Sequence, residues 1–177
     1  RLFPSPLPAM KKNFAALAVA AVIAALAAFV LLSPASNAAP EFHLTALDGR
    51  NIDTGSLKGK VTLVNFWFPT CPGCVSEMPK LVKMDGDYRG RDFQILAISV
   101  PVSPENGLEQ VRAYSEQRRL PFRVAFDAER SVSRSYLNTE LYPTSVLIDK
   151  QGKVLKTYVG IPDFAALYRE VDAELAK

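Results

Sequence analysis

The sequence feature that most limits the possible folds is the run VTLVNFW at 61–67, which is followed closely by Cys71-Pro72-Gly73-Cys74. A mostly apolar run of this length is typical of a strand that is buried on both faces of a sheet. The residues from Cys71 to about Arg89 have helical spacing. Because parallel strands need a crossover connection, usually a helix, this order favours an α/β fold.

The chain after residue 40 repeats this alternation of strands and helices. The expected strands are 42–47, 50–53, 61–67, 93–100, 122–126, 144–149 and 154–159, and the expected helices are 71–89, 104–119, 131–136 and a final helix that Asp163 caps. The first two strands meet at Asp48-Gly49, which is typical of a hairpin turn. We therefore predict a central mixed β-sheet that is flanked by helices and preceded by an N-terminal β-hairpin.

An apolar segment at 14–32 precedes these elements and contains no charged residue. As a helix, its 19 residues would extend about 28 Å, close to the ~30 Å hydrocarbon core of a bilayer. Lys11 and Lys12 lie just before it, so the positive-inside rule places the rest of the chain outside the inner membrane. We favour an uncleaved transmembrane anchor for this segment.

A cleaved signal peptide remains the alternative, because the linker 33–40 offers small residues that suit cleavage. In either case we expect a leader and linker at 1–39 and a single domain at 40–177. That domain is long enough to bury a hydrophobic core of its own. It would face a compartment in which disulfides form and persist.

Charge and metal-ligating residues exclude several classes of protein. The chain contains 21 Lys and Arg against 18 Asp and Glu, and the excess comes from Arg1, Lys11 and Lys12. The domain therefore has no basic excess of the kind that a nucleic-acid binder carries. Two cysteines and one histidine, His43, are too few for a disulfide scaffold or a four-ligand zinc site. We expect no bound metal and no cofactor besides the redox-active cysteine pair.

The two cysteines have the spacing of a thiol-disulfide exchange site. Pro72 suits the first turn of a helix, where no backbone N–H is needed, so Cys71 falls at the N-cap. Free backbone N–H groups and the helix dipole stabilise a thiolate there, which makes Cys71 the expected nucleophile, accessible to solvent. Cys74 lies one turn deeper and is expected to resolve the mixed disulfide. A structural bridge is the alternative, but so short a loop restrains little of the unfolded chain.

The segment VNFWFPTCPGCVSEMPKL at 64–81 resembles the active-site segment of the thioredoxin superfamily, and it is most similar to the TlpA/ResA-type membrane-linked thiol-disulfide oxidoreductases. Pro79 and the segment YPTSVLIDKQGKV at 142–154 agree with that family in order and spacing. The resemblance covers about 41–175 and implies a thioredoxin-like fold. Thr70 departs from the family, whose members usually carry Trp before the first cysteine.

The same resemblance implies roles for residues around the cysteines. Glu77 lies three residues after Cys74 on one helix face, and as a buried carboxyl with a raised pKa it would exchange protons with that thiol. The alternative for Glu77 is a solvated surface carboxyl. Pro143 is implied to follow a cis peptide bond and to face the cysteines, with Tyr142 offering main-chain hydrogen bonds to an extended substrate. Trp67 completes the expected substrate-binding set.

The leading expectation is a reductant that exchanges disulfides with exported proteins through Cys71 and Cys74. The resemblance implies a membrane thiol reductase of the DsbD or CcdA type as its electron donor. It also implies that the bacterial inner membrane holds the chain through 14–32 with the domain in the periplasm, or that the protein is soluble there if the leader is cleaved. Apocytochrome c, which must be reduced before haem attachment, is one expected substrate.

Two other functions fit the same fold. A peroxiredoxin-like thiol peroxidase would need Thr or Ser three residues before its cysteine, where this chain has Phe68. A Sco-like copper chaperone, which is not an enzyme, would need Cys-x-x-x-Cys and a downstream histidine, whereas His43 lies upstream. Neither pattern is present, so thiol-disulfide exchange is the preferred interpretation.

Overall fold

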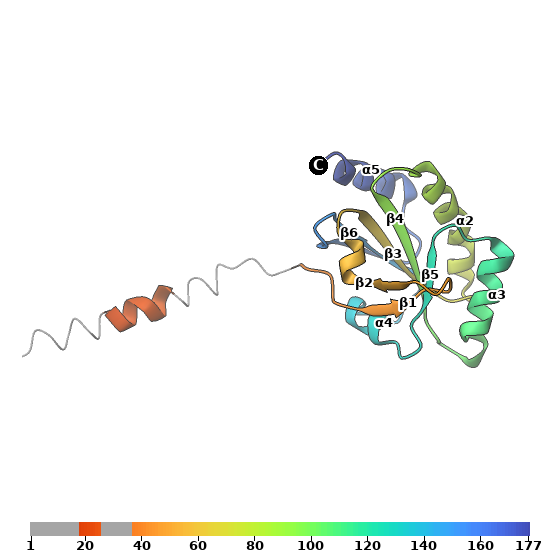
Figure 1. Cartoon of the computed structure of the whole chain (residues 1–177), viewed down its shortest axis with the longest axis horizontal. Helices are drawn as coiled ribbons and strands as arrows, with labels where there is room; N and C mark the ends of the chain where they lie inside the picture. The colour runs from red at the N-terminus through yellow and green to blue at the C-terminus, as the bar shows by residue number, and fades with distance from the viewer. Residues whose placement is uncertain (1–17, 26–36) are drawn as a thin grey trace, which may run out of the picture. The chain divides into compact units, whose positions relative to one another are not determined.

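A computed structural model describes residues 18–25 and 37–177, and the chain divides into two units, 1–36 and 37–177 (Figure 1). In the first unit, residues 18–25 are helical. The predicted anchor or signal segment, 14–32, otherwise lies outside the described residues. Within the described ranges, none of the helices has the length and apolar character that crossing a membrane requires.

The second unit contains seven strands and four α-helices among the described residues. In chain order they are β1 (His43–Thr45), β2 (Asn51–Asp53), the 3-10 turn η1 (Thr54–Leu57), β3 (Val61–Trp67), α2 (Pro72–Asp87), β4 (Phe93–Ser99), the 3-10 turn η2 (Pro104–Asn106), α3 (Leu108–Arg118), β5 (Arg123–Phe126), α4 (Ser131–Tyr136), β6 (Thr144–Ile148), β7 (Val154–Val159) and α5 (Phe164–Leu175). Strands β1 and β2 form an antiparallel hairpin, as predicted.

The main sheet has the strand order β5-β4-β3-β6-β7, with β3 at its centre. Strand β3 is parallel to β4 and antiparallel to β6, β4 is parallel to β5, and β6 is antiparallel to β7. In Figure 1, α2 and α3 lie together on one side of this sheet, and the β1–β2 hairpin and α4 lie on the other. The predicted mixed sheet with helices on its faces is confirmed.

Strand β3 separates two hydrophobic cores, because its side chains point alternately to opposite faces. Leu63 and Trp67 pack with α2, α3 and α5, whereas Val64 and Phe66 pack with the hairpin and α4. Every residue of β3 is buried, which confirms the prediction of a strand covered on both faces. The carboxyl end of this strand carries the chain directly to Cys71.

The segment 104–119, predicted as one helix, is divided by Gly107. Residues Pro104–Asn106 form the separate 3-10 turn η2, and α3 begins only at Leu108. Gly107 has an extended backbone, with φ −73° and ψ 176°, and serves as the N-cap of α3. An extended residue at this point interrupts the helical hydrogen-bond pattern, so the turn and the helix are distinct elements.

The chain joins the second unit beside the turn between β6 and β7. The Ala39 N–H donates to the Gly152 carbonyl at 2.9 Å, and the Val154 N–H donates to the Asn37 carbonyl at 2.7 Å. Strand β6 ends beside the start of β3, because Thr62 pairs with Ile148. Residues 37–39 therefore lie at the end of the sheet opposite to the one that leads to Cys71.

Candidate active site around Cys71 and Cys74

Cys71 is the N-cap of α2, and Pro72 occupies the first turn, as predicted. The Cys71 backbone is extended, with φ −80° and ψ 113°, and its Sγ accepts a hydrogen bond from the Cys74 N–H at 3.1 Å. The first N–H groups of a helix have no partner within it, so a cysteine sulfur here receives both a hydrogen bond and the positive end of the helix dipole. The local sequence thus places one sulfur where its anion is stabilised.

A disulfide joins Cys71 and Cys74, whose Cα atoms are 5.2 Å apart. Cys71 exposes 5% of its surface and Cys74 exposes 1%. The expected order of accessibility is confirmed, but the expectation of an open sulfur at Cys71 is wrong for this oxidised state. Both cysteines belong to the core cluster that also contains Met78 and Trp67. Of the two cysteines, Cys71 therefore offers the larger exposed fraction to an attacking thiol.

Glu77 is fully buried on α2, so the alternative of a solvated surface carboxyl is ruled out. Asn65 of β3 donates a hydrogen bond from Nδ2 to Glu77 Oε2 at 3.3 Å, and its Nδ2 also donates to Ser145 Oγ at 2.9 Å. Burial raises the pKa of Glu77 to about 7, although the Asn65 hydrogen bond and the charge of Lys80 each lower it in part. The carboxyl can therefore gain or lose a proton near neutrality.

Pro143 lies against the turn that contains the cysteines, and the Tyr142–Pro143 peptide bond is cis, as the resemblance implied. A Cβ atom on Gly73 would come within 3.1 Å of Pro143 Cδ, so only glycine leaves this contact unstrained. The Tyr142 ring packs edge-on against Phe68, with centroids 5.6 Å apart. The structure thus brings Pro143 and Tyr142 to the cysteine turn, and their contact with a substrate stays a prediction.

Trp67 requires a correction. Its side chain is fully buried and packs against Tyr114 of α3, with ring centroids 5.0 Å apart. Because it has no exposed surface, it is not available to contact a docking protein, and we remove it from the expected substrate-binding set. Its position explains why: the pleat of β3 turns Trp67 toward the α2–α3 core instead of toward the rim.

Two polar residues near the site were not predicted. Ser145 of β6 contacts Asn65 beneath Glu77, and Asn106 of η2 contacts Thr70, the residue before Cys71. Both are fully buried. No periodic pattern indicates either contact, because each joins residues that are far apart in the sequence.

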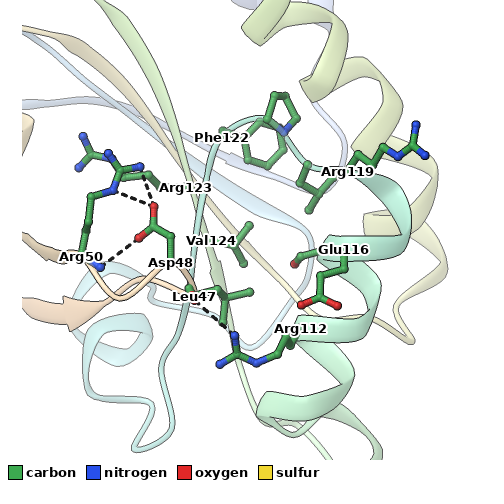
Figure 2. Close-up of a pocket in the computed structure, with 12 residues that line it drawn as sticks. Leu47, Asp48, Arg50, Arg112, Glu116, Arg119, Phe122, Arg123 and Val124 are labelled. Carbon is green, nitrogen blue, oxygen red and sulfur yellow. Dashed lines mark hydrogen bonds and ion pairs between the residues drawn. The ribbon is translucent and has the colours of Figure 1, made fainter.

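A separate cleft of about 420 Å³ lies between the hairpin turn, the end of α3 and the start of β5. Figure 2 shows Asp48 held by Arg50 on one wall and Arg112 beside Glu116 on the other. The cleft contains neither cysteine nor Glu77. Among the described residues, no group of three or more His, Cys, Asp or Glu side chains could hold a metal ion. The two cysteines lie at the N-terminus of α2, outside this cleft.

Comparisons with known proteins identify the family to which the chain belongs. The Redoxin family model matches residues 34–170. The thiol-disulfide oxidoreductase ResA of Bacillus anthracis is 35% identical over 122 residues, which are 69% of this chain and 68% of that protein. The thioredoxin-like protein YneN of Bacillus subtilis is 29% identical over 77% of this chain and 78% of its own length.

Solved structures show the same fold. A candidate thioredoxin from Neisseria meningitidis matches with a TM-score of 0.72 and 49% identity, covering 81% of this chain and 93% of that one. A thiol:disulfide interchange protein of the thioredoxin family from Chlorobium tepidum matches with a TM-score of 0.69 and 29% identity, covering 81% and 99%. The chain therefore belongs to the Redoxin family, and it is a thiol-disulfide oxidoreductase with a thioredoxin-like fold.

Proposed function

We propose that this oxidoreductase works as a reductant of disulfides in exported proteins. The observation that carries the exchange chemistry is the position of Cys71, whose sulfur accepts the Cys74 N–H at the start of α2, and the reducing direction is proposed from the resemblance to ResA-type proteins. In the reduced protein this position favours the Cys71 thiolate, which is the form that attacks a disulfide. A bond forms between Cys71 Sγ and one substrate sulfur, and the other substrate sulfur leaves as a thiolate.

In the second step, Cys74 resolves this mixed disulfide. Its thiol loses a proton and attacks Cys71 Sγ, which releases the second substrate thiolate and leaves the Cys71–Cys74 disulfide that the structure contains. Two electrons pass from the protein to the substrate. Glu77 is the acceptor that we propose for the Cys74 proton, because it is buried one helical turn away with a pKa raised to about 7.

Substrate contacts are proposed for the surface formed by Tyr142 and Pro143. Gly73 lies directly against Pro143, so a substrate segment that reaches the exposed part of Cys71 also meets the residues around this bond. We propose that the Tyr142 main chain binds an extended segment of the substrate, as the resemblance implies. Main-chain recognition of this kind accepts many sequences, which suits exchange with several partners.

We further propose that the domain works in the periplasm and is held at the inner membrane through 14–32. The support is the apolar character of that segment and the two lysines before it. Because such a compartment is oxidising, the spent disulfide needs a reductant, for which we propose a membrane thiol reductase of the DsbD or CcdA type. Apocytochrome c, with its Cys-x-x-Cys-His site, is the substrate that we propose to test first.

Trapping of mixed disulfides tests this function directly. Cys74→Ser removes the resolving thiol, so covalent adducts between Cys71 and exported proteins should accumulate in cells and disappear on treatment with dithiothreitol. Mass spectrometry of the adducts would identify the substrates. The Cys71→Ser/Cys74→Ser double variant is the control and should give no adducts. If Cys74→Ser yields none either, the proposed attack by Cys71 is wrong.

A simple assay separates this function from the two alternatives. The wild-type chain should catalyse the reduction of insulin disulfides by dithiothreitol. A thiol peroxidase would instead consume peroxide, and a copper chaperone would bind one copper ion tightly without turnover. Peroxide consumption or copper binding in the absence of insulin turnover would overturn the proposal.

A further inference from the structure

Thr70, the residue before Cys71, is held by a buried amide from a different loop. The Thr70 N–H donates to Asn106 Oδ1 at 3.2 Å, and the Thr70 hydroxyl donates to the same oxygen at 3.0 Å. Asn106 is fully buried, whereas Thr70 is exposed. Two bonds to one buried oxygen therefore fix the main chain and the side chain of the residue that precedes the nucleophile.

The orientation of the Asn106 amide follows from its partners. A backbone N–H can only donate, so the atom that faces Thr70 must be the amide oxygen. The amide nitrogen then donates to Ser103 Oγ at 2.7 Å, and the Asn106 N–H donates to the Ser103 carbonyl at 2.9 Å. Ser103 thus holds both the side chain and the main chain of Asn106. These two bonds fix the position of the amide oxygen that accepts from Thr70.

This support acts on the short connection between β3 and α2. Only Phe68, Pro69 and Thr70 separate the end of the strand from Cys71. The Cys71 N–H donates to the Phe68 carbonyl at 3.2 Å, so the connection is restrained at its start by that bond and at its end by Asn106. The N-cap geometry, in which Cys71 Sγ receives the Cys74 N–H, depends on where this connection delivers Cys71.

We propose that Asn106 is a positioning residue for Cys71, which acts by holding Thr70 so that the Cys71 thiolate of the reduced protein keeps its N-cap hydrogen bond. The inference rests on the thiol-disulfide exchange at Cys71 proposed above. A covalent bond restrains Cys71 in the oxidised protein, whereas in the reduced protein only the surrounding contacts do. Loss of the Asn106 contact should therefore cost the reduced form more than the oxidised form.

The experiment measures the equilibrium constant between reduced and oxidised protein in glutathione buffers. Asn106→Ala should lower the constant for reduction by up to about tenfold, because the full energy of an ordinary hydrogen bond is the upper limit for the difference in cost between the two forms. Thr70→Val removes only the hydroxyl bond and should give a smaller decrease in the same direction. Thr70→Ser, the matched control, retains both the N–H and the hydroxyl donor and should have the same constant as the wild-type protein. Thr70 is exposed, so its variants test the proposal even if Asn106→Ala does not fold.

The double variant gives the decisive comparison. If Asn106 acts through Thr70, adding Thr70→Val to Asn106→Ala should change the constant no further, because the bond is already absent. Independent, additive effects would overturn the proposal, as would variants that lower thermal stability while leaving the constant unchanged. Insulin turnover by the wild-type chain is measured alongside. Its absence would refute the proposed function, whereas normal turnover with unchanged constants would refute only the role of Asn106.

Discussion

Glu77 and Asp48 are both carboxylates, but they lie in opposite settings. Glu77 is fully buried on α2, three residues after Cys74, its hydrogen-bond partner is the neutral amide of Asn65, and burial raises its pKa to about 7. Asp48 lies at the cleft of Figure 2, exposed to solvent, where it pairs with Arg50 at 2.6 Å. The hydrogen bond from Arg50 holds the pKa of Asp48 below its usual value.

The difference shows which setting can support chemistry. Asp48 is fixed as an anion by a neighbouring cation, so it exchanges no proton near neutral pH. Among the described residues no cation forms an ion pair with Glu77, and with a pKa of about 7 this carboxyl is close to balance between its two protonation states near neutral pH. The arginine-lined cleft is the more conspicuous concentration of charge, yet the buried carboxyl beside the cysteines is the one suited to proton transfer. Burial without a paired charge, and not the number of charged groups, distinguishes the reactive end of this molecule.

The largest expected effect is on insulin turnover, which should depend on the cysteine site and not on the cleft of Figure 2. Cys71→Ser should reduce insulin turnover to the uncatalysed rate, because a hydroxyl does not attack disulfides. Arg112→Ala, which removes a cleft residue that donates to the Leu47 carbonyl, should leave turnover unchanged. Initial rates with dithiothreitol measure both. If Arg112→Ala lost as much activity as Cys71→Ser, the distinction between the regions would not hold.

A second prediction concerns the stability cost of Glu77. In the unfolded chain Glu77 ionises near its ordinary pKa of 4.5, and in the folded protein near 7. Between these values the unfolded chain releases a proton that the folded protein keeps, so raising the pH favours unfolding. Glu77→Gln removes this cost and should stabilise the oxidised protein at pH 8 by up to roughly 3 kcal/mol.

Denaturant unfolding at pH 4.5 and pH 8 checks this prediction. The loss in the free energy of unfolding that Glu77 causes is absent below pH 4.5 and complete above pH 7. The gain in that free energy from Glu77→Gln should therefore be much smaller at the lower pH. An equal effect at the two pH values would show that Glu77 does not titrate as proposed. The same variant, in reduced form, should also slow alkylation of Cys74 near neutral pH if the carboxyl accepts the proton of that thiol.

The smallest expected effect is at the exposed carboxylate. Asp48→Asn should leave insulin turnover unchanged and should alter the melting temperature only slightly, because solvent and salt screen an exposed ion pair. Any loss of stability should shrink further at high salt. Melting curves at low and high ionic strength provide the measurement. A large, salt-independent loss would mean that Asp48 contributes to the fold as much as a buried group does.

The fold was largely predictable because its strands are marked by apolar runs. The run 61–67 matches β3 residue for residue, and its alternation assigns Leu63 and Phe66 to opposite cores. The start of α2 was predictable because Pro72 fits a first helical turn and leaves Cys71 at the N-cap. In both cases the information is local: a pattern within a few residues determines the backbone that those residues adopt.

The remainder of the site depends on contacts between distant segments. Asn106 reaches Thr70 across 36 positions, and Ser145 reaches Asn65 across 80. Spacing along the chain cannot indicate which loops meet or which strands pair in which register, so neither contact was predictable. The expected accessibility of Cys71 and Trp67 was wrong for a related reason, because a pattern gives the direction of a side chain but not what packs over it.

The pairing of residues 37–39 with the turn between β6 and β7 has a mechanical consequence. Residues 37–39 are held at one end of the main sheet, and the disulfide lies at the opposite end. A load applied at residue 37 is therefore taken up at the end of the sheet that lies away from the disulfide. An immobilisation tag at residue 37 would therefore attach the protein by the end of the sheet that lies opposite to the disulfide.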